Sequence, residues 1–143
     1  MKWAALVLWV LTAGGGFLML GIWLQHGGMR QARGTGRRIR PPLLFSHFLL
    51  AGTGLVLWII YLANDSDTIK WIAFILLLVV ALLGFTMFAI WLSRRDATRR
   101  EDAVTEDSPP AEQHFPTAIV TLHGIAAATT LVLVFLTNIG VGE

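Results

Sequence analysis

Hydrophobic positions along the chain fall into four long runs separated by polar or basic segments. Each run has roughly 20 or more residues with almost no charged side chain, which is enough to cross a hydrocarbon core of about 30 Å as an α-helix. The runs cover residues 3–24, 43–63, 69–92 and 115–139. A membrane β-barrel would instead show shorter segments of alternating polarity. The pattern therefore predicts an all-α integral membrane protein with four spanning helices.

Successive spanning helices must alternate in direction, so the pattern predicts a single domain over residues 1–143 that forms an antiparallel four-helix bundle. The loops 25–42 and 93–114 then lie on one side of the membrane, and both termini lie on the other. The second loop has charges of both signs and the pair Pro109-Pro110, which is typical of a flexible segment. The first run is too long for the apolar core of a signal peptide, and we expect it to stay as a helix.

Composition agrees with this class, since 55% of the residues are hydrophobic and only 14% are charged. The net charge of +2 hides an asymmetry, because all nine arginines fall in the two loops on one side. The positive-inside rule makes that side cytoplasmic and both termini extracytoplasmic, in a multi-pass protein of the inner (plasma) membrane. A basic loop beside a membrane serves topology and anionic lipid, and no nucleic-acid partner is predicted. Cysteine is absent, which excludes thiol chemistry.

Small residues mark the places where helices are expected to approach closely, as at Gly14-Gly15-Gly16 in the first run and Ala51-Gly52 in the second. No internal repeat is obvious in the pattern. The second and fourth runs nevertheless share a start, because a proline precedes a histidine in both PPLLFSH and FPTAIVTLH.

Four histidines are the candidates for chemistry, and all fall in the cytoplasmic half of the predicted bundle. His26 and His114 lie at the ends of runs, where an interfacial imidazole needs little explanation. His47 and His123 lie deeper, about 8 Å past Pro42 and about 10 Å past Pro116 along their helices. In a simple bundle these two helices are diagonal neighbours roughly 12 to 14 Å apart, a gap that suits a planar metal macrocycle held from both sides. The depth match therefore favours haem b with His47 and His123 as axial ligands.

The residues around this pair are consistent with a porphyrin slot. The face of the second run that His47 defines continues through Ala51, Gly54, Trp58 and Tyr61, and the His123 face continues through Ala127. Arg38 and Arg40, together with Arg94 and Arg95, are the nearest cationic partners for haem propionates. The four candidate metal ligands are His47, His123, His26 and His114, the last two as a second pair on the same side. No catalytic residue is predicted, and the sequence does not decide whether the protein is an enzyme.

Other interpretations of the histidines remain open. Each imidazole can be structural, hydrogen-bonded to a backbone carbonyl or to a hydroxyl such as that of Ser46, Thr53 or Thr121. Zinc wants three or four ligands, and neither a cysteine nor a membrane-embedded carboxylate is present to join the pair. Copper could use His26 with Met19 or Met29.

Three functions compete at this level. The first is an electron carrier, alone or as a subunit of a redox complex. The second is a non-catalytic accessory or assembly subunit whose small-residue stripes bind other helices. The third is a small transporter or a copper-binding membrane protein, although the spans lack the carboxylates of a proton relay.

With four runs, two histidines on alternate helices and small residues beside them, the chain resembles the small four-helix membrane b-type cytochromes of the cytochrome b561 and CopD-like kind. It also resembles uncharacterised four-span membrane proteins of high-GC bacteria. The first resemblance implies haem b, iron, and electron transport to or from quinone or a protein. The expected partners are the lipid bilayer, quinone, other membrane subunits or a second copy of the chain. Two-haem members of that kind place a second histidine pair near the opposite surface, where this chain has no histidine.

Overall fold

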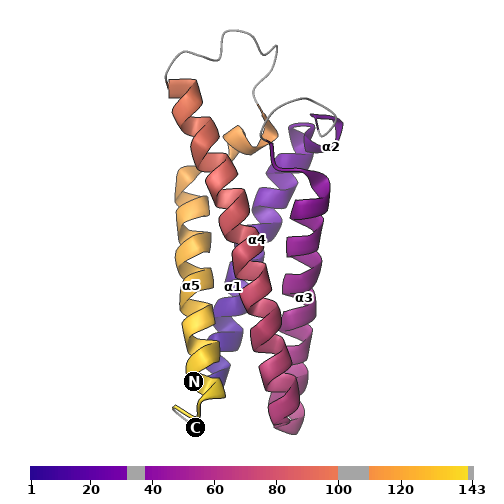
Figure 1. Cartoon of the computed structure of the whole chain (residues 1–143), viewed down its shortest axis with the longest axis vertical. Coiled ribbons are helices and arrows are strands. Elements are labelled where there is room, and N and C mark those ends of the chain that lie inside the picture. The colour runs from indigo at the N-terminus through magenta and orange to yellow at the C-terminus, as the bar shows by residue number, and fades with distance from the viewer. Residues whose placement is uncertain (32–37, 100–109, 142–143) are drawn as a thin grey trace.

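Four long helices lie side by side in the computed structural model, which describes residues 1–31, 38–99 and 110–141 and, for 96–99, the backbone alone (Figure 1). They are α1 (Lys2–Gln25), α3 (Pro41–Asn64), α4 (Asp67–Arg99) and α5 (Thr117–Asn138). Each contains a stretch that is long and apolar enough to cross a membrane. The prediction of an all-α chain with four candidate membrane spans is therefore confirmed.

The segments predicted as loops contain more helix than expected. α4 continues past Leu92 to Arg99, because the sequence after Leu92 has neither the glycine nor the proline that would stop it. Two short elements, α2 (Gly28–Gln31) and the 3-10 helix η1 (Ala111–His114), lie beside the long helices. Residues 32–37 and 100–109 of the predicted loops lie outside the described residues. They include Arg33, Arg37, Arg100 and Pro109.

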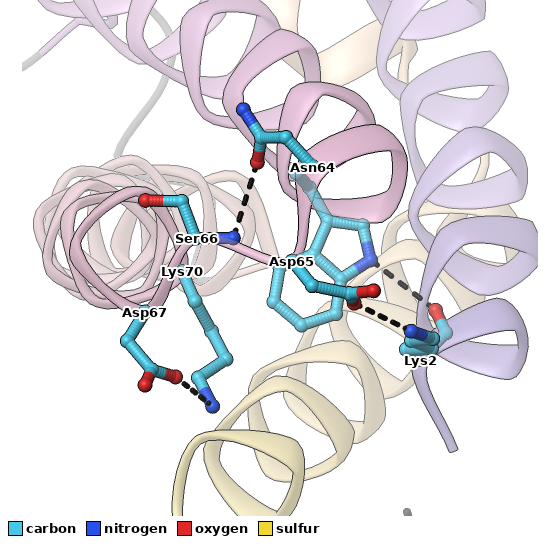
Figure 2. A network of polar contacts seen from close by, with 7 residues as sticks. Lys2, Asn64, Asp65, Ser66, Asp67 and Lys70 are labelled. Atoms are coloured by element: carbon cyan, nitrogen blue, oxygen red, sulfur yellow. Dashed lines mark hydrogen bonds and ion pairs between the residues drawn. The ribbon is translucent and has the colours of Figure 1, made fainter.

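The connection between α3 and α4 is a tight turn of two residues, Asp65 and Ser66. Asp65 adopts a left-handed conformation with φ 50°, which aspartate tolerates better than most side chains, and its N–H donates to the Tyr61 carbonyl at 2.8 Å. Lys2 at the start of α1 forms an ion pair with Asp65 at 2.7 Å, and Lys70 pairs with Asp67 at 2.8 Å (Figure 2). The short turn forces α3 and α4 to run side by side in opposite directions.

Contacts between the long helices follow a closed order, α1 to α3 to α4 to α5 and back to α1. The closest pairs are α3 with α4 and α1 with α5. Helices α3 and α5 thus each contact both α1 and α4. The two ends of the chain lie at one end of the molecule, and α2 lies at the other (Figure 1).

Two hydrophobic clusters fill the interior at different heights. The cluster nearer the termini, here the terminal cluster, consists of Ala5, Trp9, Trp58, Tyr61, Ala73, Leu77 and Val134. The cluster nearer the loops, here the loop cluster, consists of Trp23, Ile39, Leu44 and Ala111. His47 on α3 follows Leu44 of the loop cluster and precedes Trp58 of the terminal cluster. The layer between the two clusters is thus the layer that holds the imidazole.

Polar contacts at the loop end tie three separate segments together. The buried carboxylate of Glu112 in η1 accepts a hydrogen bond from the N–H of Ile39, with 3.1 Å between Oε1 and N. The side-chain oxygen of Gln31 accepts from the N–H of Ala111 at 2.9 Å and from Nη1 of Arg38 at 3.3 Å. These bonds fix η1 and the start of α3 against α2.

Replacing Glu112 by alanine is expected to destabilise the protein by about 1–3 kcal/mol, because the buried N–H of Ile39 loses its acceptor. Glu112→Gln keeps an oxygen at the same place and should lose much less. Thermal unfolding of the two variants in the same detergent measures the difference. Equal losses in both variants would show that this hydrogen bond does not stabilise the loop end.

Candidate functional site

The imidazoles of His47 and His123 approach each other across the interior from α3 and α5. Their ring centroids are 6.5 Å apart, and the ring planes are inclined at 54°. Both side chains are half-buried. The two histidines at matched depth that the sequence singles out are therefore neighbours in space, although they are 76 positions apart in the chain.

His47 is held by the neighbouring helix α4. Its Nδ1 lies 3.0 Å from the carbonyl oxygen of Val80. A carbonyl oxygen can only accept, so Nδ1 carries the proton, and in the neutral ring Nε2 keeps its lone pair. Gly84 lies one turn after Val80, and a Cβ atom there would be only 3.2 Å from Cε1 of His47. The missing side chain at Gly84 thus gives the imidazole its place against α4.

His123 is held by α1 in the same way. Its Nδ1 lies 3.0 Å from the carbonyl oxygen of Thr12, so this ring also donates from Nδ1. Gly16 lies one turn after Thr12, and a Cβ atom there would be 3.4 Å from Cε1 of His123. A Cβ at Gly15 would be 3.5 Å from Nδ1, an ordinary contact.

The residues that hold the histidines are the ones that sequence reasoning missed. A backbone carbonyl and a hydroxyl such as that of Thr53 were both open possibilities as partners, and the Thr53 hydroxyl donates instead to the Leu49 carbonyl of its own helix at 2.9 Å. The partners are backbone carbonyls. Because every residue has a carbonyl, the residue types at these positions do not reveal this role. The available signal is a glycine four residues later, because a side chain there would cover the carbonyl that the imidazole must reach.

Some of the predicted slot residues serve the protein's own core. A Cβ on Gly54 would lie 3.0 Å from Cζ2 of Trp9, so the indole of Trp9 already fills the space beside this glycine. Trp58 is fully buried in the terminal cluster, and its Nε1 donates to the Lys2 carbonyl at 3.2 Å. Ala51 and Ala127 are half-buried, each one turn after its histidine. Of the predicted slot residues, only Ala51 and Ala127 therefore lie close to the histidines along their helices.

The arginines predicted to meet propionates lie at the loop end. Arg38 is half-buried beside Gln31, and Arg40 is exposed at the residue that precedes α3. Arg95 donates to the Thr117 hydroxyl at 2.7 Å and lies over the ring of Trp91, 4.8 Å from its centroid. These side chains are on the same side of the histidine layer as the loop cluster.

His26 and His114 form a second histidine pair at the loop end. Their rings are stacked with centroids 3.8 Å apart and planes inclined at 18°, and both residues are exposed. Nδ1 of His26 donates to the Ile22 carbonyl at 2.8 Å. Nitrogen lone pairs lie in the ring plane, so two nearly parallel stacked rings do not converge on one metal ion. This pair therefore plays no part in the proposal below.

Among residues 1–31, 38–99 and 110–141, no group of three or more histidine, aspartate or glutamate side chains could hold a metal ion. A zinc ion needs such a group, because it takes three or four ligands from the protein. A haem iron takes only its axial ligands from the protein. Two neighbouring imidazoles alone therefore do not make up the ligand set of a zinc ion.

Comparison with protein families, with characterised proteins and with solved structures found no match to this chain. The arrangement of its own residues is accordingly what any function must be argued from.

Proposed function

We propose that the protein binds one haem b in the inner (plasma) membrane, with His47 and His123 as axial ligands, and that it carries electrons alone or within a redox complex. The observation that carries this proposal is the closeness of the two imidazoles, which come from α3 and α5 and have ring centroids 6.5 Å apart. A metal bound to an imidazole nitrogen lies roughly 2 Å from it, so two rings on opposite sides of one metal have centroids about 6 Å apart. The separation of 6.5 Å is close to that value.

The hydrogen bonds of the two rings support the same proposal. Histidines that bind a metal through one nitrogen almost always donate the other ring N–H to a carbonyl or carboxylate. Val80 and Thr12 supply such carbonyls, each 3.0 Å from Nδ1. The bonds fix the tautomer and orient each ring.

The surroundings of the pair suit a buried redox group. The terminal and loop clusters lie on either side of the histidine layer and border it with apolar side chains. When bound, haem b supplies a one-electron couple whose potential depends on its axial ligands and on this apolar environment. We place the loop end, with Arg38 and Arg40, at the cytoplasmic side. There these guanidinium groups would pair with the propionates of the haem. Quinone or a membrane protein would then exchange the electrons.

The visible spectrum of the purified protein, oxidised and then reduced with dithionite, tests this proposal. We expect a sharp b-type α-band in the reduced form, either as purified or after addition of hemin to the purified protein. A folded protein that stays colourless and gains no such band with hemin would contradict the proposal. That outcome would favour an accessory subunit that binds other helices through its small-residue faces.

A further inference from the structure

Helices α1 and α4 have the same residues at corresponding positions, which the hydrophobic pattern alone does not reveal. Residues 1–24 and 69–92 align without a gap, and 11 of the 24 aligned positions are identical. The identical pairs include charged, aromatic and sulfur-containing residues, which a shared apolar composition does not explain: Lys2/Lys70, Trp3/Trp71, Ala5/Ala73, Leu8/Leu76, Ala13/Ala81, Gly16/Gly84, Phe17/Phe85, Met19/Met87, Ile22/Ile90, Trp23/Trp91 and Leu24/Leu92.

Helices α3 and α5 correspond in the same manner. Residues 47–57 align with residues 123–133, and 6 of these 11 positions are identical. The identical pairs are His47/His123, Ala51/Ala127, Thr53/Thr129, Leu55/Leu131, Val56/Val132 and Leu57/Leu133. The chain therefore contains two successive hairpins with one histidine each.

The contacts between helices show the same correspondence. Exchanging the two hairpins turns the close pair α1 with α5 into the close pair α4 with α3. The equivalent residues Ala5 and Ala73 are both fully buried, and Trp23 and Trp91 are 1% and 4% exposed. Such reciprocity is that of a two-fold dimer, here with the two halves joined in one chain.

We infer that the protein is a fused pair of two-helix repeats, about residues 1–64 and 69–139, in which each repeat holds the histidine of the other. Thr12 and Gly16 of the first repeat position His123 of the second. Val80 and Gly84 of the second repeat position His47 of the first. The reciprocal holding of the imidazoles stands on geometry alone, whereas the role of Gly16 and Gly84 in ligand binding rests on the proposed haem function.

The glycine that recurs is the one that lies beside Cε1 of an imidazole in both helices. Gly14 and Gly15 of α1 lie between the Thr12 carbonyl and Gly16, and α4 has leucines at the two corresponding positions. Gly16, in contrast, recurs as Gly84. A Cβ at Gly14 would meet nothing within 4 Å. The repeated feature is thus the uncovered carbonyl four residues before a glycine, and not glycine content in general.

Leucine substitutions test the positioning role one histidine at a time. Gly84→Leu should displace His47 alone, and Gly16→Leu should displace His123 alone. Gly21→Leu is the matched control in α1, because a Cβ there would meet nothing within 4 Å. Nitrogen-15 NMR of histidine-labelled protein without haem, assigned with His47→Ala and His123→Ala, reports which nitrogen carries the proton. We expect the Nδ1–H form for both rings in the wild type and in Gly21→Leu, and its loss at one ring in each of the other variants.

Hemin titration adds a second measurement. Loss of a group that orients a metal ligand typically weakens binding 10- to 100-fold, and we expect losses of this size, similar in Gly16→Leu and Gly84→Leu, with none in Gly21→Leu. If a leucine variant does not fold, the alanine variants replace it. Gly84→Ala should then disturb His47 more than Gly16→Ala disturbs His123, because the added Cβ would lie 3.2 Å from the first ring and 3.4 Å from the second.

An exchange variant tests the equivalence of the repeats. In this chain residues 1–24 and 69–92 trade places, so that each histidine meets the carbonyl and glycine of the other helix. We expect both rings to keep the Nδ1–H form. A folded exchange variant that loses this form at either ring would overturn the inference.

The outcomes separate this inference from the proposed function. If the wild type does not bind hemin but its rings respond to the glycine variants as expected, the haem proposal fails and the inference stands. If hemin binds but the leucine or alanine variants change neither the tautomers nor the affinity, the inference fails and the haem proposal stands.

Discussion

Replacing His47 or His123 by alanine is expected to abolish the sharp reduced α-band, because each variant leaves the haem iron with one axial imidazole instead of two. The two variants should lose the band equally, since the rings have equivalent hydrogen bonds of 3.0 Å. Each variant gives up one hydrogen bond, with a net contribution to stability of only about 1 kcal/mol. Dithionite-reduced spectra and far-UV circular dichroism of the same samples would show a lost band in a protein that is still helical.

The second histidine pair provides the control for this experiment. His26→Ala and His114→Ala remove one ring of the exposed stack and should leave the band unchanged. A band that survives in both His47→Ala and His123→Ala would show that the assigned ligands are wrong. A band lost only in the His26 and His114 variants would move the cofactor to the loop end.

Gly28→Ala is expected to give the largest loss of stability of any glycine substitution in the described residues. A Cβ atom at Gly28 would overlap the indole of Trp23, whose side chain is only 1% exposed. The rigid indole cannot move aside without disturbing the loop cluster, and overpacking of this kind typically costs 1–3 kcal/mol, so we expect a loss of about 3 kcal/mol. Thermal unfolding in detergent measures the loss.

Gly21→Ala is the matched control for Gly28→Ala. A Cβ at Gly21 would meet nothing within 4 Å, and alanine favours a helix over glycine by about 1 kcal/mol, so this variant should be neutral or slightly more stable. If both variants unfold at the same temperature as the wild type, the close packing of Trp23 on Gly28 does not contribute to stability.

The four helices could be predicted because each depends on a local property of the sequence. A run of apolar residues without backbone partners in lipid has to form a helix, whatever the rest of the chain does. Pro41 and Pro42 start α3 because proline needs no hydrogen-bond acceptor in the first turn. The hydrophobic pattern does not predict that α4 extends to Arg99. Charged residues indicate where a helix leaves the membrane, but the helix can continue beyond that point.

The identities between α1 and α4 are present in the sequence, but the hydrophobic pattern does not reveal them. The positions that differ between α1 and α4 are mostly apolar in both helices, so a hydrophobicity profile does not reveal the correspondence. The identical positions include the exposed Phe17 and Phe85, so burial does not mark all of them. The structure adds that the identical pair Gly16 and Gly84 lies beside the two imidazoles.

The sequence by itself determined the four helices, the depth of His47 and His123, and the concentration of arginines at one end, because all three depend on position along the chain. Only the tertiary structure decided which groups hold the imidazoles, since the Val80 and Thr12 carbonyls are backbone atoms that every residue possesses. It also decided that Trp9 fills the space beside Gly54. Whether a small residue leaves room for a ligand or for a neighbouring side chain depends on which helix packs against it, and that is a property of the assembled bundle.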